Sequence, residues 1–119
     1  MQLNHLNLSV PDVAETRAFF ETYFGFAAVG EARNDNIAIL LGDGGFILTL
    51  MRAEQPTYPR MFHIGFAQES DEKVNEIHQR LSADGLEVNP PKRLHGAWTF
   101  YYQAPGGILV EILHQAGAA

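Results

Sequence analysis

Hydrophobic and polar residues alternate at the start of this chain, in the stretch QLNHLNLSV at residues 2–10. Successive side chains of a β-strand point to opposite faces, so this alternation is typical of a strand with one buried face. The two sides of the strand are Leu6, Leu8 and Val10 against His5, Asn7 and Ser9. The pattern predicts a half-buried strand that presents polar side chains on its other face.

The pattern then changes to helical spacing. Asp12 is followed three residues later by Glu15, which is the arrangement of a helix N-cap. Apolar and aromatic residues recur at helical spacing from Val13 to Phe24, and Gly25 is the kind of residue that commonly ends a helix. We expect a helix between Asp12 and Gly25.

Three strands are expected after this helix, near residues 26–33, 36–42 and 45–52. The turn sequence GDGG joins the last two as a hairpin. Residues 53–60, AEQPTYPR, contain two prolines and no periodicity, which indicates a linker.

The same order of elements returns after the linker. It comprises a strand at 61–67, a helix over about 70–84 that ends at Gly85, and strands near 86–93, 97–103 and 107–114. The sequences also align, since HLNLSV matches HIGFAQ at an offset of 58 residues and GGFILTL matches GGILVEI at an offset of 62. This repetition predicts one α+β domain, residues 1–119, made of two βαβββ modules at 1–52 and 61–119.

The repeat places His63 on His5, at the same position of the first strand of each module. In each strand the aliphatic and aromatic neighbours, including Phe62 and Ile64, are expected to pack under the helix, while the histidines face the other way. A single histidine in a strand is usually a packed residue whose ring nitrogens bind backbone or water. Two histidines at equivalent repeat positions are harder to explain by packing.

A third residue joins this pair. Glu111 lies between Val110 and Ile112 in the stretch GGILVEILH, where a carboxylate needs a reason to be present. It either points to water at the edge of a sheet or belongs to a site. The matching position of the first module is Thr49, which is a poor metal ligand, so a symmetric set of four ligands is broken.

Composition narrows the function. The chain of 119 residues has a net charge of −6 and only two lysines, which leaves no basic face for nucleic acid. No apolar run is long enough to span a bilayer and the first residues do not resemble a signal peptide, so we expect a cytoplasmic protein without membrane contact.

The absence of cysteine excludes disulfides, zinc-thiolate sites and cysteine nucleophiles. Any metal must therefore be held by imidazole, carboxylate or water. Two imidazoles and one carboxylate, from His5, His63 and Glu111, suit one divalent ion of Fe, Mn, Ni or Zn and leave positions open for a substrate. Such a set indicates catalysis rather than a structural metal.

The sequence resembles the vicinal oxygen chelate superfamily, which includes glyoxalase I, extradiol dioxygenases, fosfomycin-thiol transferases, methylmalonyl-CoA epimerases and bleomycin-binding proteins. The stretches that carry the resemblance are NHLNLSVPDVAETRAFFETYFGF at 4–26, FHIGFA around His63, and FYYQAPGGILVEI at 100–112. The resemblance implies paired βαβββ modules that form a cup-shaped, partly open mixed β-sheet with the helices outside. His5, His63 and Glu111 fall on its metal-ligand positions.

Several subfamilies match the sequence in part. Glyoxalase I usually supplies a glutamate where this chain has Thr49, which argues against a lactoylglutathione lyase. Ring-cleaving dioxygenases and fosfomycin-thiol transferases match the ligand set more closely. The transferases usually carry a potassium-binding loop, where this chain reads LHGAWT, and most of the dioxygenases are about twice as long. Tyr101 matches the aromatic strand of the transferases.

Three functions are therefore weighed. The leading one is a metal-dependent enzyme whose small-molecule substrate chelates the ion through two vicinal oxygens, with Tyr101 as a candidate catalytic residue. The substrate pocket is expected to include Asn7, Thr49 and Trp98. The alternatives are a metal-free, drug-sequestering module like the bleomycin-binding proteins, and a family member that retains its ligands without efficient activity. A homodimer is expected, because the exposed sheet edges can be covered by a second copy.

Overall fold

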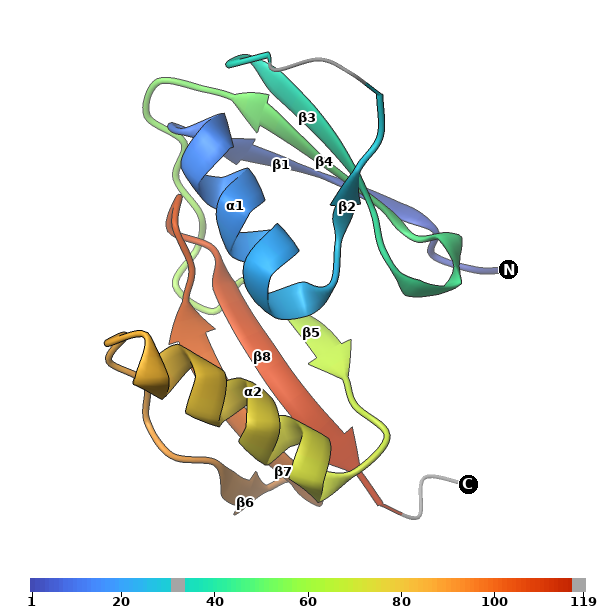
Figure 1. The fold of residues 1–119 in the computed structure, drawn as a ribbon, viewed down its shortest axis with the longest axis vertical. Coiled ribbons are helices and arrows are strands. Elements are labelled where there is room, and N and C mark those ends of the chain that lie inside the picture. Colours follow the sequence, from blue (N-terminus) through green and yellow to red (C-terminus); the bar gives the residue numbers. More distant parts are fainter. Residues whose placement is uncertain (31–33, 117–119) are drawn as a thin grey trace. The chain divides into compact units, whose positions relative to one another are not determined.

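The computed structural model describes residues 1–30 and 34–116. The first part of the chain forms β1 (His5–Val10), α1 (Val13–Phe24), β2 (Ala27–Ala28), β3 (Ile37–Leu41), the short 3-10 helix η1 (Asp43–Gly45) and β4 (Ile47–Arg52). The second part forms β5 (His63–Ala67), α2 (Asp71–Ala83), β6 (Lys92–Leu94), β7 (Ala97–Gln103) and β8 (Leu109–Gln115). The predicted pair of βαβββ modules is confirmed (Figure 1).

Each module contains one open, four-stranded mixed sheet. The strand orders are β1-β4-β3-β2 and β5-β8-β7-β6, and in both sheets the first strand runs parallel to the last strand of its module. Asn7 pairs with Thr49 in the first sheet, as Gly65 pairs with Glu111 in the second. These registers reproduce the offsets of 58 and 62 residues between the two sequences, so the repeat extends to individual residue pairs.

Contacts along the chain divide it into two units. The first contains Met1–Tyr58 with Ala104–Gly107, and the second contains Pro59–Gln103 with Ile108–Ala119. The turn between β7 and β8 thus belongs to the first unit, where Gly106 has a φ of +88° and a Cβ at this position would lie 2.9 Å from Val10 Cγ1. Only glycine combines that conformation with so close an approach. That residues 1–119 act as a single domain stays a prediction.

Both helices begin and end near the residues expected. The Asp12 side chain accepts a hydrogen bond from the Glu15 amide at 3.0 Å, and Gly25 ends α1 in the left-handed conformation. The Ser70 side chain caps α2 in the same way through the Lys73 amide. No helix among the described residues is long and apolar enough to cross a membrane.

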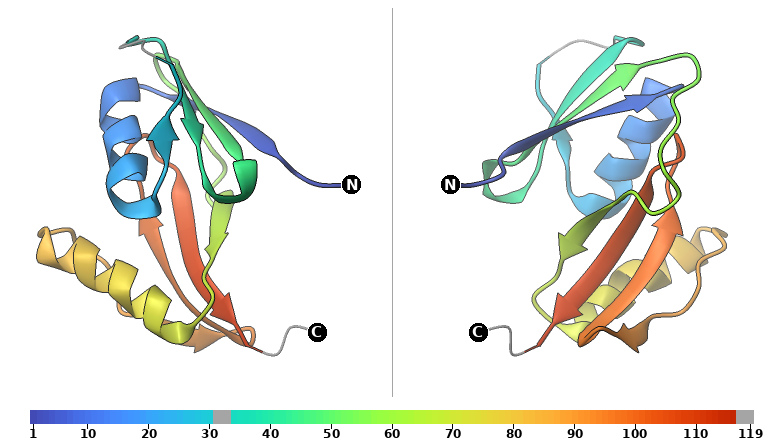
Figure 2. Two further views of the ribbon diagram at one scale, coloured as in Figure 1. Left: turned by 45° about the vertical axis from the view of Figure 1, so that its right-hand side comes forward. Right: turned by 180° about the vertical axis from the view of Figure 1, so that it is seen from behind.

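Each helix packs on one face of its own sheet and leaves the other face uncovered by helix (Figure 2). The covered faces form the cores. Core residues with less than 2% of their surface exposed include Leu8, Phe20, Leu40, Leu48 and Leu50 in the first module and Val74, Leu81, Val110 and Ile112 in the second. Alternation along each strand therefore brings its remaining side chains to the uncovered face.

Two predicted strands are shorter than expected. Of the predicted range 86–93 only Lys92 and Arg93 are strand, in β6 (Lys92–Leu94), because Pro90 and Pro91 have no amide hydrogen to donate to a ladder. Only Ala27–Ala28 is strand within the predicted range 26–33, of which residues 31–33 lie outside the described part of the chain.

The strand predicted at 61–67 begins two residues late, at His63. Phe62 was expected to pack under the helix but is exposed, with 37% of its surface accessible, because it precedes the ladder. The Phe62 amide instead donates to the carbonyl of Pro59, in a turn that leads into β5.

Candidate metal and substrate site

Glu111 lies in the interior of the second sheet. Its strand, β8, is paired with β5 on one side and β7 on the other, so the interpretation of a glutamate at the sheet edge is wrong. The flanking residues Val110 and Ile112 are fully buried toward α2. Glu111 therefore points to the face without a helix, which we call the second open face; its residues near Glu111 are His63, Gly65, Leu109, Leu113, Thr99 and Tyr101.

The Glu111 carboxylate is held in place there. Its side chain is only 15% exposed, and its Oε2 accepts a hydrogen bond of 2.7 Å from the hydroxyl of Thr99. The opposite residue on β5 is Gly65, which has no side chain to cover the carboxylate. The second carboxylate oxygen, Oε1, faces His63.

His63 is fixed by its other ring nitrogen. Nδ1 lies 2.9 Å from the backbone oxygen of Met61. A carbonyl oxygen only accepts, so Nδ1 carries the proton and the neutral ring keeps its lone pair on Nε2. This hydrogen bond from the remote nitrogen to a carbonyl is the arrangement that orients metal-ligating histidines in proteins.

Nε2 of His63 and Oε1 of Glu111 lie 3.4 Å apart. Both atoms carry lone pairs in the neutral imidazole and the ionised carboxylate, so a proton or a cation between them is favourable. Donors at 2.0–2.2 Å from one ion and at right angles to each other lie about 3 Å apart. The pair therefore fits two neighbouring ligands of a divalent metal.

Tyr101 stands beside both groups. It is directly opposite Glu111 in the ladder, and its ring meets the His63 ring edge to face with centroids 5.5 Å apart. Desolvation raises the pKa of the Tyr101 phenol, and the charge of Glu111 with a hydrogen bond to it raises this pKa further. The phenol is therefore protonated at neutral pH and can act as a hydrogen-bond donor.

A cavity of about 340 Å³ adjoins Tyr101 and Thr99 in the second unit. The loop of Asn89, Pro90 and Pro91 forms one wall, and Lys92 also borders the cavity. Its volume lies just above the lower limit, about 300 Å³, of pockets that hold small molecules.

The first open face is the surface of the first sheet that carries His5. Asn7 and Thr49 share it, since they pair with each other and lie two residues beyond the His5–Ile47 pair. Nδ1 of His5 lies 2.7 Å from the Asn4 side-chain oxygen, an acceptor, so Nε2 of His5 also keeps the lone pair. Both candidate histidines are thus held in the same tautomer.

The first open face also carries exposed apolar side chains. Ile39, Leu41 and Met51 are 41%, 43% and 43% exposed. Ile39 is directly opposite Thr49, which is the position that Tyr101 has opposite Glu111 in the second sheet.

The structure brings some of the predicted site residues together and separates others. His63, Glu111 and Tyr101 meet in the second unit, and His5, Asn7 and Thr49 share one face of the first. No group of three or more His, Asp or Glu side chains that could hold a metal occurs among residues 1–30 and 34–116. Two of the three proposed ligands are therefore in contact, and His5 belongs to the other unit.

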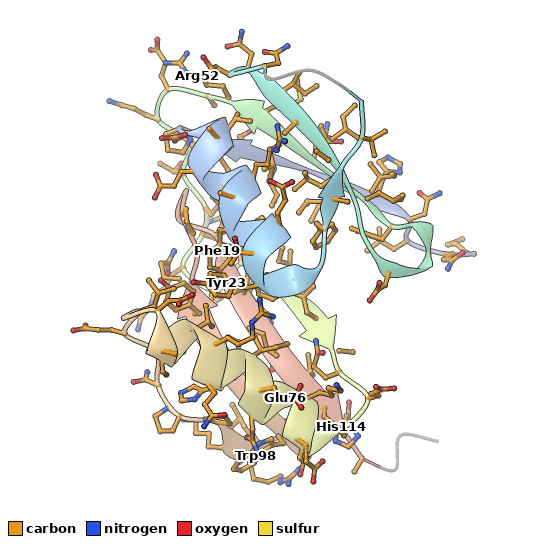
Figure 3. All side chains as sticks on the ribbon, in the orientation of Figure 1. Phe19, Tyr23, Arg52, Glu76, Trp98 and His114 are labelled. Atoms are coloured by element: carbon orange, nitrogen blue, oxygen red, sulfur yellow. The ribbon has the colours of Figure 1, made fainter. Side chains whose placement is uncertain are left out.

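Trp98 does not lie on the second open face. It is on the side of β7 that packs against α2, where its indole nitrogen donates to the Asn75 side chain at 2.8 Å and Arg93 lies 5.2 Å from its ring (Figure 3). Alternation along β7 separates it from Thr99 and Tyr101. The structure thus gives Trp98 a packing role under α2 in place of the expected position in a substrate pocket.

Two other histidines, His114 and His78, contact residues outside the candidate site. His114 Nδ1 lies 2.7 Å from Asp71 at the start of α2, and Arg93 binds the other oxygen of that carboxylate at 2.9 Å. The Nε2 of His78 is buried without a hydrogen-bond partner among the described residues, and its ring contacts Phe100.

Sequence reasoning missed the groups that orient the candidate ligands. Asn4 and the Met61 carbonyl hold the two histidines, and Thr99 holds Glu111. The signal for Thr99 was present, because alternation along residues 97–103 places it on the same side as Tyr101. The Met61 acceptor is a backbone carbonyl, which every residue has, so the sequence could not single it out.

A family model matches residues 2–112, nearly the whole chain. It describes the Glyoxalase/Bleomycin resistance protein/Dioxygenase superfamily. The chain belongs to this superfamily. The family resemblance expected from the sequence is therefore confirmed.

Solved members of the superfamily share the fold. The structure of a possible glyoxalase from Bacillus cereus is 49% identical, covers 95% of this chain and 98% of its own, and has a TM-score of 0.87. A variant of the fosfomycin resistance protein FosX from Listeria monocytogenes, complexed with Mn(II) and 1S,2S-dihydroxypropylphosphonic acid, is 24% identical, covers 98% and 93%, and has a TM-score of 0.79.

A lactoylglutathione lyase from Agrobacterium tumefaciens is 19% identical, with 95% and 92% of the two chains covered and a TM-score of 0.76. At this identity and that of FosX, the likeness establishes the fold alone. No curated protein matches the chain.

Proposed function

We propose that this superfamily member is an enzyme that depends on one divalent ion of Fe, Mn, Ni or Zn, held by His5, His63 and Glu111. Its substrate is a small molecule with two vicinal oxygens. The observation that carries the proposal is the His63–Glu111 pair, in which an imidazole lone pair and a carboxylate oxygen face each other at 3.4 Å. Because two ligands do not complete a centre, His5, the repeat partner of His63, is the proposed third ligand.

The bound metal would act as a Lewis acid that stabilises negative charge developing on a substrate oxygen. The protein's own groups have separate tasks. The protonated Tyr101 phenol, which is hydrogen-bonded to Glu111 in the free protein, would redirect its single O–H to a substrate oxygen beside Glu111. Asn7 and Thr49 would border the substrate from the face of His5, and Lys92 would attract an anionic group that enters the cavity near Tyr101.

A metal-binding assay tests this proposal. Protein purified without chelator, and the same protein after reconstitution with each candidate ion, is measured by elemental analysis. We expect about one ion per chain, as in sites of this ligand set. Glu111→Ala should lose the ion and all turnover, whereas the register-matched control Thr49→Ala should keep the ion. A wild-type protein that binds no metal would refute the proposal.

The identity of the ion would then direct the search for activity. Iron would favour ring cleavage, manganese would favour group transfer to an epoxide or a related substrate, and nickel or zinc would favour isomerase or lyase chemistry. The position of Thr49 opposite Asn7, where a second carboxylate would be needed, disfavours the lactoylglutathione lyase reaction.

The proposed homodimer is tested by light scattering, and the mass of a single chain would contradict it.

The second candidate is a metal-free protein that sequesters a small apolar molecule. The observation that favours it is the aliphatic first open face, with Ile39, Leu41 and Met51 exposed. An environment-sensitive apolar dye should bind in either case. Binding that is unchanged in Glu111→Ala, together with absence of metal in the wild type, would select this function.

A further inference from the structure

Thr99 is a buried polar residue on the otherwise accessible second open face. It is 1% exposed and lies on β7, opposite Leu113 and therefore diagonal to Glu111. Its hydroxyl donates to Glu111 Oε2 at 2.7 Å. A hydrogen bond from a hydroxyl to an ionised carboxylate, shielded from water, is among the stronger hydrogen bonds in proteins.

This hydrogen bond distinguishes the two carboxylate oxygens. Oε2 is engaged by Thr99 from the β7 side, and Oε1 faces Nε2 of His63 on the β5 side. Because Thr99 is β-branched and sits within a paired strand, its side chain has few alternative rotamers. The carboxylate is therefore oriented by a rigid group with one oxygen directed toward the imidazole.

The first module has neither the threonine nor the glutamate of the Thr99–Glu111 hydrogen bond at the matching positions. The position that corresponds to Thr99 is Ile37, opposite Met51, and the position that corresponds to Glu111 is Thr49. A hydroxyl buried under a sheet face has a desolvation cost that isoleucine at the same position avoids. The polar residue thus occurs in the module that has the carboxylate.

We propose that Thr99 is the positioning residue of the metal site, which holds Glu111 so that Oε1 alone is presented to the ion. The inference rests on the proposed function, since it assigns Glu111 as a ligand. Thr99 does not touch the ion or the substrate in this role. It acts through Glu111, as outer hydrogen-bond partners of metal ligands generally do.

The test compares Mn²⁺ affinities of the purified protein, measured by calorimetry and by the decrease of the free Mn²⁺ signal in electron paramagnetic resonance. Thr99→Val keeps the shape and removes the donor, so we expect the dissociation constant to rise by roughly 10- to 100-fold. Thr99→Ser restores the donor and should stay within about threefold of the wild type, a small fraction of that effect. Ile37→Val is the matched control in the first module and should leave the affinity unchanged.

Circular dichroism and thermal unfolding establish that each variant is folded. If Thr99→Val does not fold, Thr99→Cys replaces it, because a thiol is similar in size and a much weaker donor. A folded Val or Cys variant with wild-type Mn²⁺ affinity would overturn the role of Thr99 while leaving the metal site standing. Loss of affinity in Thr99→Ser equal to that in Thr99→Val would also overturn it, since packing rather than the hydroxyl would then be responsible.

The proposed function fails by a different result. If the wild type binds no Mn²⁺ or any other candidate ion, Glu111 is not a ligand, and the role of Thr99 is overturned with it. If the wild type binds metal and Glu111→Ala does not, only the series at position 99 decides the inference.

Discussion

The open faces of the two modules are built on matching strand pairings but carry different side chains. In the first, His5 and Asn7 border a surface of Ile39, Leu41 and Met51. In the second, His63 is surrounded by Glu111, Tyr101 and Thr99, which are linked by hydrogen bonds and ring contacts.

The difference lies in three register-matched positions. Glu111, Tyr101 and Thr99 of the second sheet correspond to Thr49, Ile39 and Ile37 of the first. The ladders are the same, so the backbone does not require either set. A βαβββ module provides a sheet face, and the side chains on that face determine which chemistry it can support. Only the histidine is kept in both modules.

The largest effect is expected from making the first face resemble the second. Thr49→Glu places a carboxylate at the position that matches Glu111, and an additional anionic ligand should tighten Mn²⁺ binding by about tenfold, or about 1.4 kcal/mol. Thr49→Gln has the same length without the charge and should leave the affinity near that of the wild type. Calorimetric titration of both variants measures the difference.

Equal affinities of Thr49→Glu and Thr49→Gln would contradict a position of Thr49 beside the ion. The repeat would then relate the two modules in backbone but not in their distance from the metal. A gain of lactoylglutathione lyase activity in Thr49→Glu would support the view that the residue at this position separates the subfamilies.

A smaller effect is expected from the helices. At the offset of 58 residues that relates the two N-caps, Asp12 and Ser70, His78 of α2 corresponds to Phe20 of α1. Phe20 is fully buried among aromatic rings, whereas the buried Nε2 of His78 has no hydrogen-bond partner. An unsatisfied buried polar atom costs roughly 1–3 kcal/mol.

His78→Leu should therefore raise the free energy of unfolding by about 1 kcal/mol, the lower end of that range, since the leucine loses part of the ring contact with Phe100. The control is Gln79→Leu, an exposed neighbour in α2, which should change stability by less than about 0.5 kcal/mol. Urea unfolding measures both. A destabilised His78→Leu protein would indicate that the imidazole is satisfied by water.

The sequence contains most of this fold because the modules are locally consistent. Alternation in residues 5–10, the cap at Asp12 and the stop at Gly25 each predicted what the structure has. The failures occurred where local signals were weak. The stretch before β6 has aliphatic and proline residues together, and the prolines prevented pairing over most of its length.

The site could be predicted less completely. His63 was singled out by the repeat and Glu111 by its apolar neighbours, and the second sheet places them in contact because strands β5 and β8 are neighbours. Trp98 was expected in the substrate pocket but lies on the side of β7 under α2, because residue types alone do not say which face of β7 a helix covers. The hydrogen bond from Thr99 depends on the register of two strands and on a rotamer, which residue types alone do not specify.

The smallest effect concerns the start of α2, which the first module does not match, since Val13 stands where α2 has Asp71. Hydrogen bonds from His114 and Arg93 lower the pKa of Asp71 below its ordinary value. A carboxyl whose pKa is lowered by folding stabilises the protein at pH values above its unfolded pKa, and this contribution is lost as the pH falls below about 4.

When the pH is lowered from about 5, the free energy of unfolding of Asp71→Asn should therefore decrease less than that of the wild type, as measured by urea unfolding. Glu72→Gln, which removes an exposed carboxylate from the same helix turn, should retain the acid dependence of the wild type. Equal acid dependence of Asp71→Asn and wild type would mean that the Asp71 interactions are screened by solvent, and the two helix starts would then be energetically alike.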